Sequence, residues 1–450
     1  MSTIKVLPTV SRRIGDLTRL SPFSSGNSFA GQDNRLNNIT VDGSYFNNSF
    51  GLAGQPGDRT GVAPISLDAI EQIQVNIAPY DVRQGNFVGA GVNTVTRSGN
   101  NDVSGSIYYS YRHQGLVGQD AGDLKYNPGT FKYNLLGVRL GGPIIPNKLF
   151  FFGSYEQDKD IRPGTTFTAN TGTQPIGGSI TRVQASDLDA LSSFLKSNFD
   201  YETGPYQGYD HETPATRALL RLDYNLNDNN KLSLRYTHLD SQTDVLVSNS
   251  SSLGVGGRRG STNSLNFQNS NYIILENIRS IVGEWNSRLS DNMTNNLIAG
   301  YTFNDESRDS RGKFFPLVEI LEGGSNYTTF GFEPFTPNNE LRYKTFQLQN
   351  NLTWYLTNHY LTFGISGERY ESENVFFPGS QSVYVYNSLA DFYTDANGYL
   401  SNPNRDTSTV TLRRFQVRWS NIPGQTKPIQ PLKVLYLGAY AQDDWQVSRH

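Results

Sequence analysis

Segments that alternate apolar and polar residues with a period of two dominate the sequence after Val103. Within Lys231–Thr237, leucine and tyrosine occupy the even positions, and lysine, serine, arginine and threonine occupy the odd positions. The same pattern recurs in Ser104–Arg112, Arg217–Leu226 and Arg414–Trp419. Because successive side chains of a strand point to opposite faces, each segment predicts a strand with one apolar and one polar face.

The connections between these strands alternate between short and long. Short turns are predicted at Gly142–Asn147, Asn227–Asn230, Ser290–Asn292 and Thr357–His359, with a somewhat longer connection at Asn421–Pro431. Long polar segments are His113–Thr130, Asp158–Pro214, Asp240–Asn271, Asn304–Leu341 and Glu371–Val410. Soluble domains rarely carry five such loops, because their median connection is about 4–6 residues. Outer-membrane barrels combine short periplasmic turns with long extracellular loops.

The alternation by itself fits either a soluble β-sandwich or a membrane-spanning barrel, so the loop rhythm decides between them in favour of the barrel. Charged residues make up 18% of the chain and aromatic residues 12%, a β-rich composition with polar loops. With a formal net charge of -3, the chain has no excess of basic residues of the kind that binds nucleic acid. The absence of cysteine excludes disulfides and cysteine-ligated metals.

Strand counting gives about eleven strands, whereas bacterial single-chain barrels have even numbers. We therefore expect the sequence to stop within a barrel, and the isolated chain, with two unpaired edges, to aggregate or fail to insert. No helix-period segment exceeds a few turns, and the best helix candidate is Ala185–Asn198 in the second long loop. Aromatic residues near strand ends are predicted to form interfacial girdles, with core packing as the alternative: Tyr109, Tyr111, Phe151, Tyr236, Tyr301, Trp354, Trp419 and Trp445.

The first hundred residues follow a different pattern, which predicts a small mixed α/β domain over residues 1–102. Thr9–Leu20 is compatible with a short helix, and Asn34–Gly43 reads as a strand that ends in an Asp-Gly turn. Ser66–Gln72 is a helical turn with Ser66 as its cap, followed by a strand over Glu71–Ile77. A glycine-dense segment and a short strand, Val92–Arg97, complete this domain.

Several stretches of this domain resemble the plug domain of TonB-dependent outer-membrane receptors: LDAIEQIQV (67–75), PYDVRQGNF (79–87) and GAGVNTVTRSGNN (89–101). SRRIGDLTRLSP (11–22) and NNITVDG (37–43) are similar to the Oar-like branch, and AYAQDDWQVS (439–448) resembles a barrel strand of these receptors. The family fills a barrel of twenty-two strands with its plug. The resemblance therefore implies a mostly β fold. A small α/β plug over 1–102 precedes a transmembrane antiparallel β-barrel over 103–450, with about 11 of the expected 22 strands present.

The resemblance also implies a function. Such a receptor lies in the outer membrane of a Gram-negative bacterium, binds a scarce extracellular ligand and imports it with energy from the TonB complex. The sequence shows no signal peptide, no clear TonB box and no domain upstream of the plug, so contact with TonB is expected through an upstream box. The expected partners are TonB, outer-membrane lipid and a small-molecule, oligosaccharide or peptide ligand that the loops do not identify. No cofactor, metal or nucleic acid is expected.

Six residues of the plug-like segments are candidates for a structural or gating role: Asp81, Arg83, Gly85, Gly89, Gly91 and Arg97. The three glycines allow positive φ and close approach of the backbone, with ordinary turn glycines as the alternative. The two arginines are able to pair with lumenal carboxylates such as Asp223 or Glu284. Solvated surface positions are the alternative for them.

Catalytic motifs are not convincing. Ser193–Lys196 and Ser290–Asn292 match two short motifs of penicillin-recognising enzymes, but no Lys-Thr-Gly follows, and the two fall in different kinds of connection. We therefore predict that the protein is not an enzyme. Two other functions remain open at this point. One is a structural or adhesive outer-membrane barrel without active transport, and the other is a soluble secreted β protein that binds glycans through aromatic residues.

Overall fold

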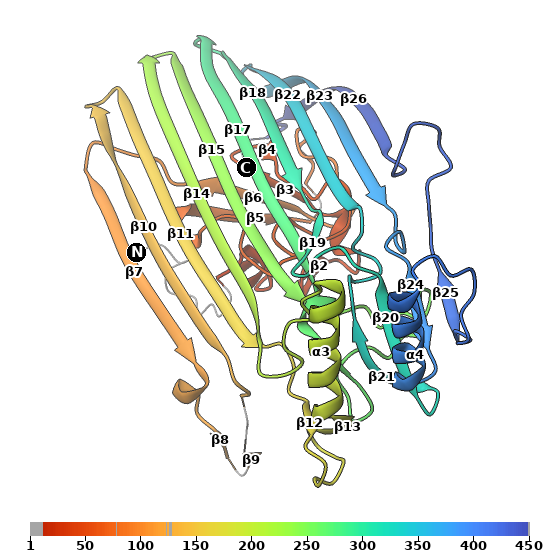
Figure 1. The fold of residues 1–450 in the computed structure, drawn as a ribbon. Helices are drawn as coiled ribbons and strands as arrows, with labels where there is room; N and C mark the ends of the chain where they lie inside the picture. The colour runs from red at the N-terminus through yellow and green to blue at the C-terminus, as the bar shows by residue number, and fades with distance from the viewer. Residues whose placement is uncertain (1–11, 78, 123, 126–127, 449–450) are drawn as a thin grey trace.

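Ten long strands form one curved antiparallel sheet, here called the wall, in the computed structural model, which describes residues 12–77, 79–122, 124–125 and 128–448 (Figure 1). Each strand pairs with its neighbours in chain order. The strands are β7 (Ser104–His113), β10 (Lys132–Ile145), β11 (Leu149–Pro163), β14 (Asp210–Asn227), β15 (Asn230–Val245), β17 (Tyr272–Ser290), β18 (Met293–Asp305), β22 (Asn339–Tyr355), β23 (His359–Phe376) and β26 (Gln430–Trp445). The short β19 (Arg308–Ser310) pairs with β17 and makes the sheet eleven-stranded.

Short turns and long loops alternate along the wall as the sequence predicts. Turns of two or three residues join β10 to β11, β14 to β15, β17 to β18 and β22 to β23 at one end of the wall. The loops 114–131, 164–209, 246–271, 306–338 and 377–429 leave from the other end (Figure 1). The predicted alternation of short and long connections is confirmed, so one end of the wall carries short turns and the other end carries long loops.

The two faces of the wall reverse the arrangement of a soluble protein. Leu220 and Leu234 point away from the rest of the molecule and are 57% and 46% exposed. Arg217 and Arg235 point to the inner face and are 3% and 4% exposed. An apolar face open to the surroundings and a covered ionic face indicate a membrane barrel, because a sandwich would bury the apolar face in its core.

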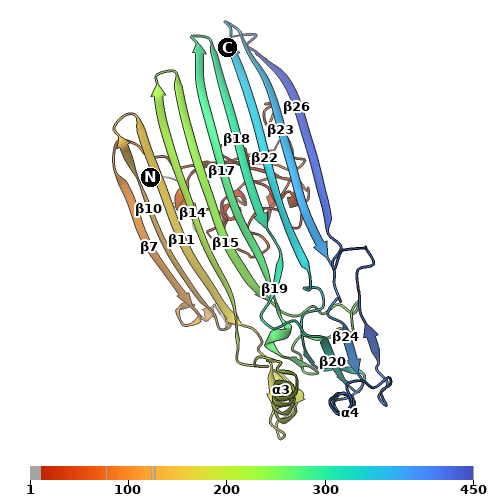
Figure 2. The same ribbon diagram turned by 45° about the horizontal axis from the view of Figure 1, so that its top comes forward.

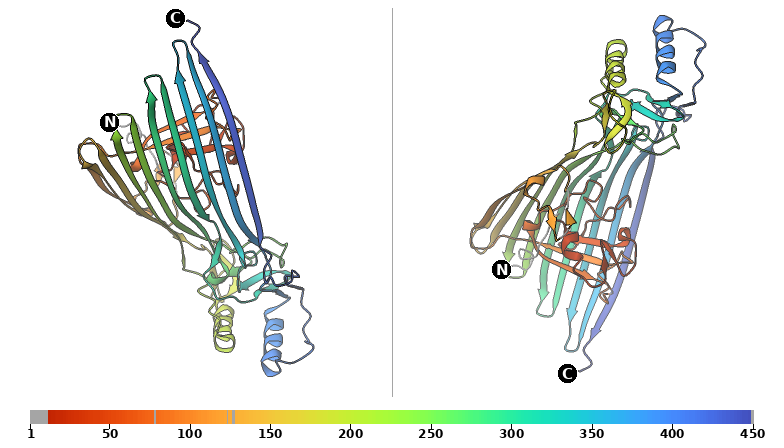
Figure 3. Two further views of the ribbon diagram at one scale, coloured as in Figure 1. Left: turned by 90° about the horizontal axis from the view of Figure 1, so that it is seen from above. Right: turned by 90° about the horizontal axis from the view of Figure 1, so that it is seen from below.

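The N-terminal subdomain, residues 12–101, lies against the inner, concave face of the wall, as Figures 2 and 3 show. Its four-stranded sheet has the order β4-β3-β6-β5, with β3 and β6 parallel. Its elements are α2 (Ile14–Thr18), β1 (Ser24–Ser25), β2 (Ser28–Phe29), η1 (Asn34–Leu36), β3 (Asn38–Val41), β4 (Ser44–Tyr45), η2 (Leu67–Ala69), β5 (Ile70–Asn76) and β6 (Gly91–Thr96). An apolar cluster that includes Val41, Ile70 and Val92 of this sheet also contains Phe152 and Leu219 of the wall, so apolar packing contributes to the contact between the two bodies.

Four of the long loops fold together into a second body, the loop domain, beyond the end of the wall (Figure 1). Its mixed sheet has the order β16-β21-β20-β24-β25. The elements are β12 (Thr168–Asn170), β13 (Ile180–Gln184), α3 (Ala185–Phe199), β16 (Leu265–Asn266), η4 (Gln268–Ser270), β20 (Leu317–Glu322), β21 (Ser325–Phe330), β24 (Val383–Tyr386), α4 (Leu389–Ser401) and β25 (Arg414–Gln416). The remaining loop carries η3 (Gln114–Leu116), β8 (Asp120–Ala121) and β9 (Leu124–Lys125).

The helices are few and short. The predicted helix at Ala185–Asn198 is confirmed as α3, whereas α4 was not predicted. The helix predicted at Thr9–Leu20 is shorter than expected, with α2 over Ile14–Thr18 and positions 9–11 outside the described residues. Across the described ranges, none of the helices combines the length and the apolar character needed to cross a membrane.

The prediction for Arg414–Trp419 was wrong in its location. Only Arg414–Gln416 form a strand, β25, which pairs with β24 in the loop domain and not with the wall. Its alternation matches that of wall strands because an edge strand of a small sheet also has two different faces. The connection predicted at Asn421–Pro431 is therefore the end of the longest loop.

Most of the predicted girdle aromatics project from the wall. Tyr109, Tyr301, Trp354 and Trp445 are exposed on its strands, as are Tyr111 and, partly, Phe151 and Tyr236. Trp419 is exposed but follows β25 in the loop domain, so it takes no part in a girdle on the wall.

A charge placed on each face of one strand tests this orientation. We predict that Leu234→Arg, on the apolar face, destabilises the barrel by about 2–4 kcal/mol if that face meets the hydrocarbon core. The adjacent Ser233→Arg projects inward opposite Glu284, its register partner, and is expected to be tolerated. The measurement is the amount of folded, heat-modifiable protein in outer membranes. Equal yields for the two variants would contradict the orientation.

Candidate functional site

The contact between the N-terminal subdomain and the wall is polar and ionic over much of its area. Carboxylates from one side meet arginines, hydroxyls or backbone N–H groups from the other at several separate points. This arrangement follows from the wall sequence, because its inward positions carry charges that require partners once they are removed from water. We take this contact and the cavity beside it as the candidate functional site.

Asp42 is the first of these carboxylates along the chain. It lies in the two-residue turn between β3 and β4, where Asp42 and Gly43 both have positive φ, at 48° and 77°, as a type I′ hairpin requires. Oδ2 accepts a hydrogen bond from Arg235 at 2.5 Å, and Oδ1 lies 3.4 Å from Arg221. Thr96 adds its N–H at 2.8 Å and its hydroxyl at 2.7 Å.

The two arginines stand directly opposite each other on neighbouring strands, in register. Like charges at such a position repel, and here one carboxylate from the subdomain lies between them. Burial opposes ionisation of Asp42, but Arg235, Arg221 and the Thr96 hydrogen bonds outweigh it and hold the pKa of this carboxyl below its usual value. Asp42 therefore joins the subdomain to β14 and β15 as an anion.

Glu156 of β11 forms a second connection. Its buried carboxylate accepts hydrogen bonds from Ser66 at 2.9 Å, from Tyr108 and from Arg217 of β14. Ser66 is also the predicted cap of the turn η2, since its hydroxyl accepts the N–H of Asp68 at 3.2 Å. The same hydroxyl therefore caps the start of the turn η2 in the subdomain and contacts the wall.

Glu276 of β17 forms a third connection, to the backbone of a subdomain loop. It accepts N–H groups from Gly57 at 2.6 Å, Arg59 at 3.0 Å and Thr60 at 3.3 Å. The Arg59 side chain then reaches Glu306 at 3.4 Å. Backbone donors and the side chains of Arg59 and Thr60 together fix the position of this loop.

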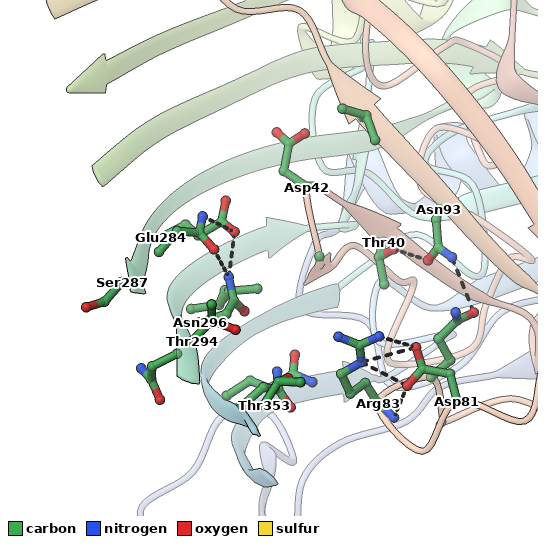
Figure 4. Close-up of a pocket in the computed structure, with 18 of the residues that line it drawn as sticks. Thr40, Asp42, Asp81, Arg83, Asn93, Glu284, Ser287, Thr294, Asn296 and Thr353 are labelled. Carbon is green, nitrogen blue, oxygen red and sulfur yellow. Dashed lines mark hydrogen bonds and ion pairs between the residues drawn. The ribbon is translucent and has the colours of Figure 1, made fainter. Parts of the chain in front are cut away.

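A polar cavity of about 760 Å³ lies between the subdomain and the short-turn half of the wall (Figure 4). Amide and hydroxyl side chains dominate its lining, and several of them are hydrogen-bonded to one another. Thr40 donates to Asn93 at 2.6 Å, and Asn296 donates to Glu284 at 2.7 Å from the opposite side. The residues Asn229 and Tyr355, at the short turns, place the cavity toward that end of the wall.

The structure brings three of the six predicted site residues to this cavity. Asp81, Arg83 and Gly91 line it, and Figure 4 shows Arg83 paired with Asp81 at 2.7 Å. Gly85 lies next to this segment, and its carbonyl accepts a hydrogen bond from Asn38 at 2.8 Å. Arg97 lies outside the lining and binds Glu71 at 2.6 Å.

Two details of the sequence prediction were wrong. None of Gly85, Gly89 and Gly91 has positive φ, which occurs instead at Asn86. Close approach holds for Gly89, where a Cβ would overlap the Asn37 side chain, whereas Gly85 has open space. Asparagine tolerates the left-handed region, so this turn does not need glycine for it.

The predicted partners of the arginines were also wrong. Asp223 binds Arg221 at 2.9 Å, and Glu284 binds Asn296, because both carboxylates have partners on the wall itself. Sequence reasoning missed Asp42 as an anchor, although it identified the Asp-Gly turn. The available signal was a set of inward-facing arginines that needed an anion from elsewhere in the chain.

Comparison with known proteins gives a consistent result. The family profile described as "Outer membrane beta barrel domain" matches residues 95–450. The TonB-dependent transporter Oar of Myxococcus xanthus is 26% identical over 161 residues, which cover 32% of this chain and 14% of that protein. The resemblance to TonB-dependent receptors predicted from the sequence is thereby confirmed.

Solved structures share the fold. The outer membrane transporter YddB from Escherichia coli matches 98% of this chain at a TM-score of 0.63 and 12% identity. The ferric enterobactin receptor PfeA from Pseudomonas aeruginosa matches 99% at 0.54 and 13% identity. The chain spans 53% and 54% of these two structures, about half their length.

Removal of the Asp42 charge tests the anchor. Asp42→Asn leaves the buried Arg235 without its carboxylate, whereas Arg221 keeps Asp223, and we expect a loss of about 3–5 kcal/mol in the free energy that holds the subdomain on the wall. Hydrogen exchange of the backbone amides in residues 12–101 measures this loss. Asp81→Asn, which breaks an exposed pair worth about 0–1 kcal/mol, is the matched control. Equal protection in both variants would argue against the anchor.

The Asp42 anchor also predicts a pH dependence. Because its folded pKa is lowered, Asp42 contributes stability that is complete above about pH 4, the pKa of a free aspartate, and is lost as the pH falls through the folded pKa. The part of the amide protection that depends on the Asp42 carboxylate should thus remain unchanged from pH 7 to pH 5 and decrease below about pH 4. Subtraction of the Asp42→Asn profile isolates this contribution. A difference between the two profiles that disappears already at pH 5 would contradict it.

Proposed function

Because this chain belongs to the outer membrane beta barrel family, in the outer membrane of a Gram-negative bacterium, we propose that it forms the first part of a receptor for active import. This receptor binds a scarce extracellular ligand and passes it through a plugged barrel with energy from TonB. In this proposal residues 1–102 are the plug, and residues 103–450 are about half of a barrel of 22 strands. The outer-membrane receptors and transporters that share this fold support the assignment.

The lengths of the connections predict which end of the barrel faces the exterior and which faces the periplasm. In outer-membrane barrels the long loops are extracellular and the short turns periplasmic. The loop domain then faces the exterior as the ligand-binding end, and the cavity beside Asp81 and Arg83 opens toward the periplasmic end. A ligand released from the loop domain would leave through this cavity.

The observation that carries the proposal is the polar contact between the N-terminal subdomain and the wall. Apolar packing against wall residues such as Phe152 and Leu219 holds one part of the subdomain, and water cannot replace it. Hydrogen bonds and ion pairs exchange with water at little enthalpic cost. The contacts of Asp42, Glu156 and Glu276 therefore hold the subdomain in one position and still permit its displacement.

The six candidate residues fit a gating role in this scheme. Asp81, Arg83 and Gly85 belong to an exposed segment at the cavity, bonded to the wall through the N–H of Val82, which donates to Gln442 at 2.8 Å. Displacement of this segment would widen the cavity. Gly89 and Gly91 allow close packing behind it, and Arg97 fixes the end of β6.

The expected partners are the TonB complex, through a TonB box upstream of the plug, and the lipid of the outer membrane. The ligand class stays open among small molecules, oligosaccharides and peptides, although PfeA and the siderophore receptor PirA from Acinetobacter baumannii favour a siderophore as the first to test. A structural or adhesive barrel is not favoured, because the similar proteins are described as transporters and receptors.

An engineered disulfide tests whether the subdomain moves. The chain has no cysteine, and the hydroxyls of Thr60 in the subdomain and Ser241 in the wall are 2.9 Å apart. Thr60→Cys with Ser241→Cys should cross-link the two bodies, abolish uptake and recover it after reduction. Uptake is measured in cells with a radiolabelled ferric catecholate, a maltooligosaccharide and a hexapeptide, with and without TonB.

The control is a cross-link within the wall. Ser280 and Thr302 are register partners on β17 and β18 with hydroxyls 2.8 Å apart, so the cysteine pair there joins the two strands and leaves the subdomain free. Import at the wild-type rate by the oxidised Thr60/Ser241 variant would contradict a moving plug. Import that continues without TonB would contradict energy coupling.

A further inference from the structure

Three cations and one carboxylate meet on the outer face of the wall, close to its long-loop end. Lys344 of β22, Glu371 of β23 and Lys433 of β26 form one row across three neighbouring strands. Arg369, two residues before Glu371 on β23, projects from the same face. These four residues are here called the cation cluster, and their strands lie side by side in Figures 1 and 2.

The single carboxylate does not neutralise the cluster. Glu371 lies 3.2 Å from Lys344, bonds Arg369 and is 4.0 Å from Lys433. Its side chain is only 17% exposed, whereas those of Lys344, Arg369 and Lys433 are 51%, 62% and 71% exposed. The carboxylate thus lies beneath the cations, and the surplus positive charge is presented outward.

The residues on either side of the cation cluster show where on the outer face its surplus positive charge lies. On the side of the short turns the same face continues with exposed apolar residues, Phe346 and Leu348 on β22 and Leu435 and Leu437 on β26. On the side of the long loops the next row holds Arg342 opposite Glu373. Arg342 is already paired with Asp305 at 3.2 Å and Glu340 at 3.0 Å. The cluster therefore marks the boundary between the apolar band and the polar rim.

We propose that the cation cluster binds the phosphate group of an anionic lipid in the outer leaflet of the membrane. The apolar band beside it meets acyl chains, so the group that reaches the cluster is the headgroup attached to them. A phosphate carries one to two negative charges, which match the surplus of the cluster, and accepts hydrogen bonds from ammonium and guanidinium donors at once.

The geometry keeps this site open. The four side chains project from the outer face, and further strands added beside β26 would extend the sheet laterally without covering that face. Lys159 of β11, a cation of the same face, has a carboxylate of its own, since it pairs with Glu212 of β14 at 2.7 Å. Position on the outer face alone therefore does not create a surplus charge.

The test uses the full-length receptor, of which this chain is proposed to form the first part, purified from outer membranes in a non-ionic detergent. Phosphatidic acid is the phosphate-bearing lipid and phosphatidylcholine the neutral one. Bound lipid is measured by native mass spectrometry. A cation near an anionic lipid surface contributes about fivefold in affinity, so Lys344→Gln, Arg369→Gln and Lys433→Gln together should weaken phosphatidic acid binding on the order of 100-fold. Phosphatidylcholine binding should not change.

Two further variants separate a binding site from a structural role. Glu371→Gln removes the central carboxylate and should strengthen phosphatidic acid binding, a change opposite in sign to that of the triple variant. Lys159→Gln, from the matched pair, should have no effect. The proposal is overturned if Glu371→Gln weakens binding, if Lys159→Gln weakens it as much as the triple variant, or if equimolar inorganic phosphate displaces the lipid.

Discussion

Two arginines that face each other across neighbouring strands determine much of this structure. Arg221 and Arg235 are in register on the inner face, and their mutual repulsion would disfavour β14–β15 pairing without an anion between them. Asp42 supplies that anion from a turn of the N-terminal subdomain. Arg221 also pairs with Asp223 of the wall, whereas the buried Arg235 receives its carboxylate from the subdomain. The wall and the subdomain therefore depend on each other at this point, because a buried arginine without its carboxylate is unfavourable.

This dependence gives the molecule an inverted distribution of polarity. Charges lie between the wall and the subdomain, and leucines such as Leu220 and Leu234 lie outside. Inward charges that find partners on the subdomain hold it at Asp42, Glu156 and Glu276. These polar contacts stand beside an apolar cluster that the subdomain shares with wall residues such as Phe152 and Leu219. Separate polar contacts are able to break one at a time and to re-form, as the proposed displacement of the subdomain requires.

The wall was predictable from the sequence because two signals agreed, the period of two within strands and the alternation of connection lengths. The turn η2, capped by Ser66, and the helix α3 were predictable because the sequence signals for them are local. Some failures were local, since α4 was missed and the helix at Thr9–Leu20 is shorter than expected. The failures that concern pairing were long-range. Arg414–Trp419 has the local pattern of a wall strand, but it pairs with β24, and its pairing depends on loops far away in sequence. Likewise, Asp42 was recognisable as a turn residue but not as the partner of two arginines from other strands.

The loop domain shows why specificity would be a property of several loops together. Val183, Leu265, Phe330 and Phe392 come from four different loops and are buried in one hydrophobic cluster. Phe330 and Phe392 contact edge to face at 5.4 Å, and Arg258 of one loop forms a fully buried ion pair with Glu319 of another. A displacement of one loop would expose apolar surface of the others, so the four loops move as one body or not at all. A ligand that contacts any of them, as proposed above, would therefore act on the whole loop domain.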